Sequence, residues 1–373
     1  MLDDITKAVL AREDIARYLH DEGRGTQTRA RIESYLDELR TTQRYSIYKA
    51  LKHPLYPILR KIDRIGEQVQ LVKAAVRGGK RIVYASNHRS HTDYLVEPLV
   101  LDDNGIRPPV IAAGINLFGG PLGLIHRHVT GAIPVRRNAK DPAYLVTLKA
   151  YVAEMLRTQD LFFYPEGGRS YSGELKSPKT GLFNAALQAD RSNLVIIPTA
   201  IAYDLVLEDH VLARQRIKRT QRAFSRELAE MVRYAVGYRS RAIVTFGRPI
   251  PVEHIEVDSR KAVLDLAHAV MAAIGRQVKI LPTTVVAAAM RPAITKRELI
   301  ARADAIVEAA RAGGANLGVQ SGREAVDLGV EPLELRGVIV VEGSRLRVRD
   351  RNVLRYYARS IEHALASPSD RTH

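Results

Sequence analysis

The pattern of apolar and polar positions divides the chain into three parts. From residue 3 to about residue 78, apolar residues recur at the spacing of amphipathic helices, as at Ile32, Tyr35, Leu36 and Leu39. A Gly-Gly pair at positions 78 and 79 then suits the C-terminal end of a helix. The pattern therefore predicts an N-terminal helical region over residues 1–78.

From residue 80 the period changes, and short apolar runs alternate with helix-like stretches. The runs are typical of buried strands and lie at residues 81–85, 110–113, 132–135, 161–164, 194–200 and 242–246. Buried strands separated by helices indicate an α/β architecture. We therefore expect a mixed sheet flanked by helices over residues 79–281.

Beyond Pro282 the character of the chain changes again. Helical stretches come first. Residues 338–341, a Glu-Gly-Ser turn and residues 345–349 then predict a β-hairpin, and a last helix is expected over residues 353–365. This pattern predicts a small C-terminal domain of helices plus a hairpin, winged-helix-like, over residues 282–373. Arg345, Arg347 and Arg349 alternate and so share one strand face, which either contacts phosphates or is the solvated side of the hairpin.

Charge and composition narrow the function classes. The chain has 373 residues, 46% of them hydrophobic, and 57 Lys and Arg against 41 Asp and Glu, for a net charge of +16. Such an excess favours anionic partners, namely nucleic acid, a membrane surface or phosphorylated substrates, although a basic surface that only keeps the protein soluble has the same composition. Cysteine is absent, which excludes disulfides and thiolate zinc sites. Neither a signal peptide nor an apolar run of the roughly 20 residues that span a bilayer is seen, so we expect any membrane role to be peripheral.

His88 and Asp93 form a candidate base and its orienting carboxylate. They lie between the apolar run at residues 81–85 and a helix-like run from residue 94. If His88 lies in the turn and Asp93 in the first helical turn, the carboxylate can bond one imidazole nitrogen and leave the other to accept a proton. Two alternatives stay open: a capping box formed by Ser90 and Asp93, and a metal site with His88, His91 and Asp93 as ligands.

Two further elements supply cations. Arg136 and Arg137 follow the apolar run at residues 132–135, where a guanidinium pair could bind phosphate or simply be solvated. Residues 166–170, Glu-Gly-Gly-Arg-Ser, follow the next run; the glycines allow backbone N–H groups to approach a ligand, although an ordinary glycine turn has the same composition. Lys179 adds another potential phosphate contact.

The absence of other motifs narrows the reaction. The chain contains no dinucleotide fingerprint, no P-loop and no Gly-x-Ser-x-Gly elbow. A base, its carboxylate and several cations in one α/β segment instead favour direct attack by a phosphorylated alcohol on an activated acyl group.

The order of these motifs resembles that of the glycerol-3-phosphate acyltransferase family, in its bacterial membrane-associated type, within the wider glycerolipid acyltransferases. Residues 87–95 resemble its first block, residues 131–137 its second, residues 162–181 its third and residues 195–203, with Pro198, its fourth. Residues 353–363 also resemble the family's C-terminal region. The resemblance thus runs from about residue 80 to the end of the chain.

The resemblance implies roles for these residues. His88 would be the general base and Asp93 its orienting group, while Arg137, Arg169 and Ser170, with Arg89, would hold the glycerol phosphate. Further positions implied at the substrates are Glu166 and Gly167 at the acceptor and Pro198 at the acyl donor. We also count Ser90, Arg136, Gly168 and Lys179 among the substrate-binding candidates. The donor would be acyl-CoA or acyl carrier protein, and neither a metal nor another cofactor is implied.

The expected activity is therefore acyl transfer to the sn-1 hydroxyl of glycerol 3-phosphate, the first step of phospholipid synthesis. Ile133-Pro134, where the family often has aromatic residues, and Tyr164-Pro165, which is closer to lysophosphatidate acyltransferases, keep dihydroxyacetone phosphate and lysophosphatidate open as acceptors. A basic nucleic-acid-binding protein is the alternative from another class, but it leaves His88 and Asp93 unexplained, and we expect no nucleic-acid partner.

A basic run also bears on location. It comprises Arg214, Arg216, Lys218, Arg219, Arg222 and Arg226. Such a run is either a solvated face or a surface that binds anionic lipid. Because the acylated product must enter a bilayer, we expect peripheral attachment to the cytoplasmic face of the membrane.

Overall fold

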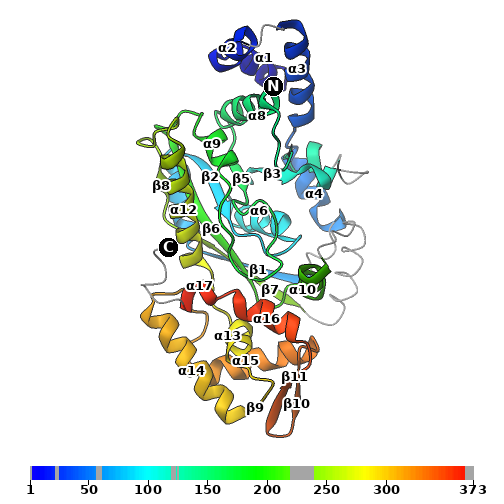
Figure 1. Ribbon diagram of the computed structural model, residues 1–373, viewed down its shortest axis with the longest axis vertical. Helices are drawn as coiled ribbons and strands as arrows, with labels where there is room; N and C mark the ends of the chain where they lie inside the picture. The colour runs from blue at the N-terminus through cyan, green and yellow to red at the C-terminus, as the bar shows by residue number, and fades with distance from the viewer. Residues whose placement is uncertain are drawn as a thin grey trace.

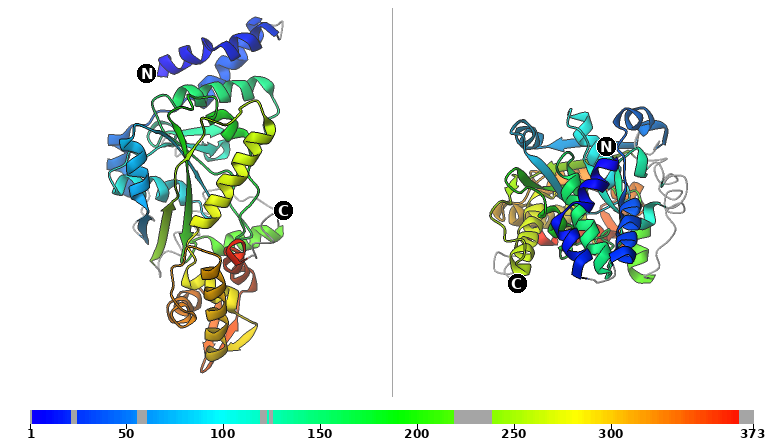
Figure 2. Two further views of the ribbon diagram at one scale, coloured as in Figure 1. Left: turned by 90° about the vertical axis from the view of Figure 1, so that its left-hand side faces the viewer. Right: turned by 90° about the horizontal axis from the view of Figure 1, so that it is seen from above.

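The computed structural model describes residues 2–21, 25–55, 61–118, 123, 126–218 and 239–365. The molecule is elongated, with N-terminal helices at one end, a large sheet in the middle and the C-terminal helices at the other end (Figure 1). The left-hand view of Figure 2 shows the same order along the long axis after a turn of 90°, and the right-hand view looks down that axis from the N-terminal end.

The large sheet is mixed and has the strand order β1-β7-β6-β2-β5-β3-β4, with β8 paired to β6. Its strands are β1 (Ile62–Glu67), β2 (Arg81–Ser86), β3 (Val110–Gly114), β4 (Ala132–Val135), β5 (Leu161–Phe163), β6 (Leu194–Tyr203), β7 (Ser240–Phe246) and β8 (Ile250–Pro251). Strands β2 to β6 are parallel to one another, whereas β7 and β8 pair with β6 in the antiparallel sense. The carboxyl ends of β2, β3, β4 and β5 therefore meet at one edge of the sheet.

Helices cover both faces of this sheet because its strands are apolar on both sides. In β2, Ile82 and Tyr84 pack into the core beneath α5 (Val69–Arg77) and α6 (Asp93–Asp103). Val83 and Ala85 pack into the opposite core. That core includes residues of α1 (Leu2–Leu10), α2 (Glu13–Asp21), α3 (Gly25–Leu39), α8 (Pro142–Met155), α9 (Gly181–Ala186) and α12 (Arg260–Gln277). The remaining helices of this part are α4 (Tyr45–Leu55), the 3₁₀ turn η2 (Ile115–Phe118) and α10 (Asp209–Lys218).

The mixed α/β sheet flanked by helices is confirmed, but the expectation that residues 1–78 are wholly helical is wrong. Residues 62–67 form β1, which pairs in parallel with β7. Ile62 is buried whereas Ile65 is 41% exposed, because β1 is an edge strand with one covered face. This pairing places β1 and α5 in the sheet layer rather than with the N-terminal helices.

The C-terminal part consists of helices around a small antiparallel sheet. Its elements are α13 (Pro282–Ala289), β9 (Ala293–Thr295), α14 (Lys296–Ala312), α15 (Gly322–Leu335), β10 (Ile339–Glu342), β11 (Arg345–Val348), α16 (Arg351–Arg359) and α17 (Glu362–Leu365). The expected hairpin is β10–β11, and β9 adds a third strand to it. The winged-helix likeness and the exact limits of the three domains stay predictions.

Two expectations concern the surface. Among the residues that the structure describes, no helix is both long and apolar enough to cross a bilayer. In the basic run, Arg214 is exposed on α10. The side chains of Arg216 and Lys218, and the whole of Arg219, Arg222 and Arg226, lie outside the described residues.

Candidate active site

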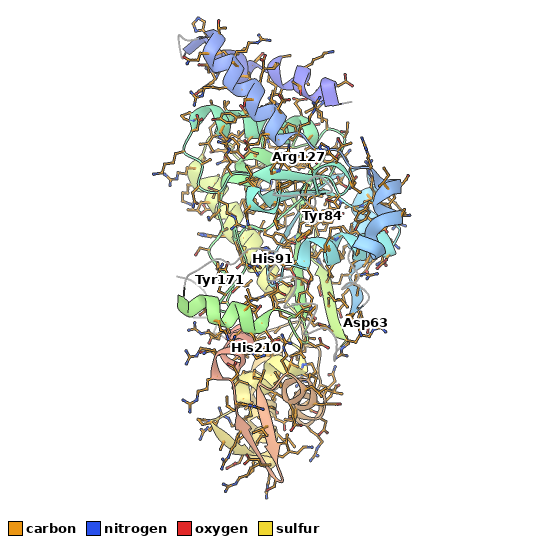
Figure 3. All side chains as sticks on the ribbon, turned by 90° about the vertical axis from the view of Figure 1, so that its right-hand side faces the viewer. Asp63, Tyr84, His91, Arg127, Tyr171 and His210 are labelled. Atoms are coloured by element: carbon orange, nitrogen blue, oxygen red, sulfur yellow. The ribbon has the colours of Figure 1, made fainter. Side chains whose placement is uncertain are left out.

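A cavity of about 110 Å³ opens at the edge where the parallel strands end. Its described lining comes from β3, from the last residue of β4 and from the segments after β2, β3, β4 and β5: His88, His91, Tyr94, Ile111, Ala112, Ala113, Gly114, Asn116, Leu117, Val135, Arg137, Tyr164, Gly167, Gly168, Arg169, Tyr171 and Leu182. Figure 3 shows two of these residues, His91 and Tyr171, between the sheet and the C-terminal part. Carboxyl ends of parallel strands are the usual place for ligands in open α/β sheets.

His88 and Asp93 are hydrogen-bonded at this cavity. Strand β2 ends at Ser86, His88 lies in the turn, and α6 begins at Asp93. The imidazole Nδ1 donates to Asp93 Oδ2 at 2.8 Å, which leaves Nε2 as the nitrogen that can accept a proton. The same Oδ2 accepts the backbone N–H groups of Arg89 at 2.6 Å and Ser90 at 2.8 Å. One carboxylate thus closes the turn, as in half of a capping box, and also orients the imidazole.

The protonation states of this pair follow from burial and from the cations nearby. Burial lowers the pKa of His88 well below its ordinary 6.5, and Arg169, Arg137 and Lys176 lower it further. The imidazole is therefore neutral, as a general base must be. Burial also raises the pKa of Asp93 to about 7, against the opposite effect of the bonds donated by Ser90, Tyr203 and Arg89.

Tyr164 holds the face of the imidazole. Its ring stacks on that of His88 with centroids 4.0 Å apart and an angle of 11° between the planes. The hydroxyl of Tyr164 donates at 2.9 Å to Glu97, which lies one helical turn after Asp93. The ring of His88 is thus fixed at its edge by a carboxylate and on its face by an anchored aromatic ring.

Three cations surround the cavity. Arg137 and Arg169 belong to its lining, and Lys176 Nζ lies 3.3 Å from the backbone carbonyl of Gly168. Gly168 has Arg137 within 4 Å of the position that a Cβ would occupy. Guanidinium groups beside glycine N–H groups in a partly buried site suit a phosphate dianion.

Gly167 is required by the backbone of this loop. Its φ is +69°, a conformation that residues with a side chain rarely adopt, and a Cβ would lie 2.7 Å from Lys179 Cδ. Lys179 itself donates from Nζ to Asn138 Oδ1 at 3.2 Å and lies outside the described lining. The loop is therefore shaped around the aliphatic part of Lys179.

Glu166 and Ser170 connect the loop at residues 166–170 to the turn that carries His88. The Glu166 carboxylate accepts the backbone N–H groups of His88 at 3.0 Å and Lys176 at 3.1 Å. Ser170 donates from its backbone to the His88 carbonyl at 2.9 Å and from Oγ to the Glu174 carbonyl at 2.7 Å. Both side chains hold the loops together and neither belongs to the described lining of the cavity.

The structure separates the adjacent arginines 136 and 137. Both residues follow the end of β4, with Arg137 in a turn, and their side chains have different partners. Arg137 lines the cavity, whereas Arg136 donates from Nε to Glu38 of α3 at 2.7 Å and lies over the ring of Tyr35 at 5.0 Å. Arg136 thus ties the N-terminal helices to the sheet.

Three more candidate residues face away from the described cavity lining. Arg89 is buried and donates to the Gly173 carbonyl, and Ser90 donates from Oγ to Glu208 at 2.8 Å. Pro198 lies within β6, opposite Ala85 of β2. Arg89 and Ser90 thus support the loops, and none of the three residues belongs to the described lining of the cavity.

The metal alternative lacks a ligand set. Among the described parts of the chain, no group of three or more His, Cys, Asp or Glu side chains could hold an ion. His88, His91 and Asp93 therefore do not form such a group.

Sequence reasoning missed several residues that position the site. They are Tyr164, Glu97, Lys176, Tyr203 and Glu208. Tyr203 donates to Asp93 Oδ1 at 2.8 Å, and Glu97 and Glu208 are fully buried. The spacing of Glu97 four residues after Asp93, on the same helix face, was an available signal; the other residues have no pattern that distinguishes them.

Comparison with known proteins agrees with this geometry. Residues 66–202 match the family model described as Acyltransferase. The chain is 34% identical over 242 residues to the glycerol-3-phosphate acyltransferase of Glaesserella parasuis, which covers 61% of this chain and 29% of that protein. It is 32% identical over 249 residues to that of Actinobacillus succinogenes, covering 63% and 30%, and 32% identical over 260 residues to that of Haemophilus influenzae strain PittEE, covering 66% and 32%.

These alignments span about a third of the length of the curated relatives. The matched residues 66–202 include β2 to β5 and all of β6 except Tyr203, with the whole described lining of the cavity. The resemblance read from the motifs is confirmed: residues 66–202 match the Acyltransferase family model, and the chain is similar to proteins named glycerol-3-phosphate acyltransferase.

Proposed function

We propose that this chain transfers a fatty acyl group from acyl-CoA or acyl carrier protein to the sn-1 hydroxyl of glycerol 3-phosphate. The observation that carries the proposal is the 2.8 Å bond between His88 Nδ1 and Asp93, in the wall of a cavity that Arg137 and Arg169 also line. The relatives named glycerol-3-phosphate acyltransferase support the same acceptor.

In this mechanism His88 Nε2 takes the proton from the acceptor hydroxyl while its oxygen attacks the thioester carbonyl. The tetrahedral intermediate then collapses, the C–S bond breaks, and the thiolate leaves as a thiol with the proton from His88. Asp93 stabilises the transient imidazolium and holds its Nδ1–H. Because the thioester is already activated, the steps balance with no further reactant.

The cations that line the cavity suit the phosphate of the acceptor. Arg137 and Arg169 offer planar N–H donors, and Gly167 and Gly168 allow the phosphate to approach the backbone. Ile111, Leu117, Val135 and Leu182 supply apolar lining for the first part of an acyl chain. Dihydroxyacetone phosphate and lysophosphatidate carry the same phosphate, so the acceptor is the point to test.

The deciding experiment is an acyl-transfer assay with the purified chain. It crosses glycerol 3-phosphate, dihydroxyacetone phosphate and lysophosphatidate with acyl-CoA and acyl carrier protein, and analyses the position of the new ester. The proposal expects 1-acylglycerol 3-phosphate as the main product. A preference for lysophosphatidate, or no transfer to any phosphorylated alcohol, would overturn it.

We further propose peripheral attachment to an anionic membrane, on the strength of the +16 net charge and the basic run at residues 214–226. Sedimentation with anionic and with neutral vesicles tests this directly. Equal binding to the two kinds of vesicle would remove the proposal, and DNA retention with a steep salt dependence would favour the nucleic-acid alternative.

A further inference from the structure

Glu208 lies where two motifs of the site meet. It belongs to the segment between β6 and α10 and is fully buried. Its carboxylate accepts Ser90 Oγ at 2.8 Å and 3.0 Å and the backbone N–H of His91 at 2.5 Å. Its Oε1 also lies 3.7 Å from Arg169 Nη1. One side chain thus contacts the turn that carries His88 and Asp93 and a guanidinium of the cavity.

The burial of this carboxylate calls for an explanation. Arg169 is itself nearly buried, with 7% of its side chain exposed, so the ion pair is largely removed from water. Burying a pair of charges costs free energy unless its geometry is good and hydrogen bonds satisfy the other polar atoms. The bonds from Ser90 and His91 meet that condition for Glu208. Arg169 lines the cavity whereas Glu208 is outside its described lining, so the carboxylate contacts the guanidinium from behind the cavity wall.

We propose that Glu208 is a positioning residue that holds the Arg169 guanidinium toward the phosphate of the acceptor and ties it to the turn of the catalytic base. The inference rests on the proposed function for the identity of the ligand. It also reassigns Ser90, since the Ser90 hydroxyl bonds to Glu208 and is directed to this support rather than to substrate.

The direction in which phosphate affinity changes separates this positioning role from the simplest alternative, in which Glu208 acts only through its charge. If Glu208 acts only through its charge, the carboxylate repels a nearby phosphate, and its neutralisation tightens phosphate binding. If Glu208 positions Arg169, its neutralisation releases the guanidinium, and phosphate binding weakens. The two roles therefore predict opposite changes in the dissociation constant.

The test compares the wild type with Glu208→Gln, which keeps the shape of the side chain and an oxygen for the His91 N–H but removes the negative charge that pairs with Arg169. Calorimetric titration with glycerol 3-phosphate should show at least tenfold weaker binding, and the KM for glycerol 3-phosphate should rise by a similar factor while kcat changes less than threefold. Unchanged or tighter binding would overturn the proposal, as would a loss confined to kcat.

Asp204→Asn is the matched control. Asp204 is also a buried carboxylate of the same segment, but it bonds to Arg241 at 3.1 Å and Ser240 at 3.1 Å, away from the cavity. The Asp204→Asn variant should lower thermal stability as Glu208→Gln does, yet leave the KM for glycerol 3-phosphate unchanged. An equal rise in KM in both variants would indicate a purely structural effect and overturn the proposal.

A double-mutant cycle and a crystal structure complete the design. Because Glu208 is proposed to act through Arg169, Glu208→Gln should add less than twofold to the weaker binding of Arg169→Ala, whereas multiplied effects would overturn the link.

If Glu208→Gln fails to fold, Glu208→Asp keeps the charge but withdraws it by one methylene, with the same expected weakening. If the wild type does not bind glycerol 3-phosphate, the proposed function fails, and the crystal structure of the variant decides this inference alone: a displaced Arg169 guanidinium supports it and an unmoved one overturns it.

Discussion

The two sheets of the molecule both carry arginines, in opposite settings. At the carboxyl edge of the large sheet, Arg137 and Arg169 line a cavity, and Arg169 is only 8% exposed. In the small C-terminal sheet, Arg345 and Arg347 of β11 are exposed, as is Arg349 just after that strand. Arg347 pairs there with Glu342 at 3.3 Å, with more than half of each side chain in solvent.

The topology of the strands produces this difference. In the large sheet, four parallel strands bring the segments that follow them to one edge, so side chains from distant parts of the chain converge. In the small sheet, β10 and β11 are antiparallel neighbours, and their polar face stays open to water. Burial of a guanidinium costs free energy unless an anion compensates it, as Glu208 does for Arg169 at 3.7 Å, whereas the exposed arginines of the small sheet stay solvated by water.

The largest effect is expected at the cavity side of the comparison, from His88→Ala. Loss of a general base typically lowers turnover by about 10²- to 10⁴-fold. Because His88 packs at the cavity rather than in either apolar core, the thermal transition should change little. Steady-state kinetics with a calorimetric scan check both parts, and a variant that keeps its turnover would remove the general-base role.

Much of the large sheet was predictable because its strands are apolar on both faces. The predicted run at residues 132–135 coincides with β4, and those at residues 81–85 and 161–164 differ from β2 and β5 by one residue. Strand β1 was missed because Ile62 and Ile65, three residues apart, imitate a helix, and an edge strand is recognised only by its partner β7. Strands β8 and β9, with two and three residues, are too short to show a period.

The next effect separates two arginines of the catalytic part, Arg169 at the cavity and Arg136 outside its described lining. Arg169→Ala should raise the KM for glycerol 3-phosphate by about 10- to 100-fold, because a hydrogen bond to a charged group contributes about 1.5–3 kcal/mol. Arg136→Ala removes an equal charge that bonds to Glu38 and should leave this KM within about twofold. Equal rises in both variants would show that general positive charge, and not the cavity, binds the phosphate.

The pH dependence tests the charge state of the base pair. The raised pKa of Asp93, about 7, means that its carboxylate gains a proton as the pH falls through about 7, while the lowered pKa of His88 keeps the imidazole neutral. A protonated Asp93 donates to Nδ1, which moves the imidazole proton to Nε2 and blocks the base. Turnover at saturating acceptor should therefore be level above about pH 7 and fall about tenfold per pH unit below it. A level profile from pH 5.5 to 8.5 would contradict this assignment.

A smaller effect is expected from Tyr164, whose ring stacks on His88. An aromatic pair contributes about 0.5–1.5 kcal/mol, so Tyr164→Leu should lower kcat about 2- to 10-fold with little change in KM. The leucine also admits water to the imidazole, so the pKa of His88 should rise toward 6.5 in an NMR titration of the ¹⁵N-labelled ring. Tyr164→Phe keeps the stacked ring and is the control; if it shifts the His88 titration as much as leucine does, stacking is not the cause.

Placement of the site was predictable only in part. The order of motifs after successive strands places His88, Arg137 and Arg169 at one edge, because carboxyl ends of parallel strands coincide. The orientation of the other candidates depends on tertiary partners that no motif specifies. Glu38 draws Arg136 away, and Gly173 accepts from Arg89. The buried carboxylate of Glu208, which comes from the segment after β6, follows no spacing rule for the same reason.

The smallest effect is expected from the exposed face of the small sheet. Replacing Arg345, Arg347 and Arg349 together by Ala lowers the net charge from +16 to +13 and removes one ion pair that is open to solvent. Such pairs contribute about 0–1 kcal/mol to stability, and substitutions away from buried features usually change it by less than about 0.5 kcal/mol each. The KM for glycerol 3-phosphate should stay within about twofold of wild type, since none of the three residues belongs to the described lining of the cavity.

Vesicle sedimentation of the same variant gives the sharper result. Loss of binding to anionic vesicles with intact kinetics would assign the face to membrane contact, whereas unchanged binding would leave it as the wet side of a hairpin. A KM raised as far as in Arg169→Ala would contradict the contrast between the two sheets. Binding of the phosphate would then depend as strongly on arginines exposed to water as on one that lines the cavity.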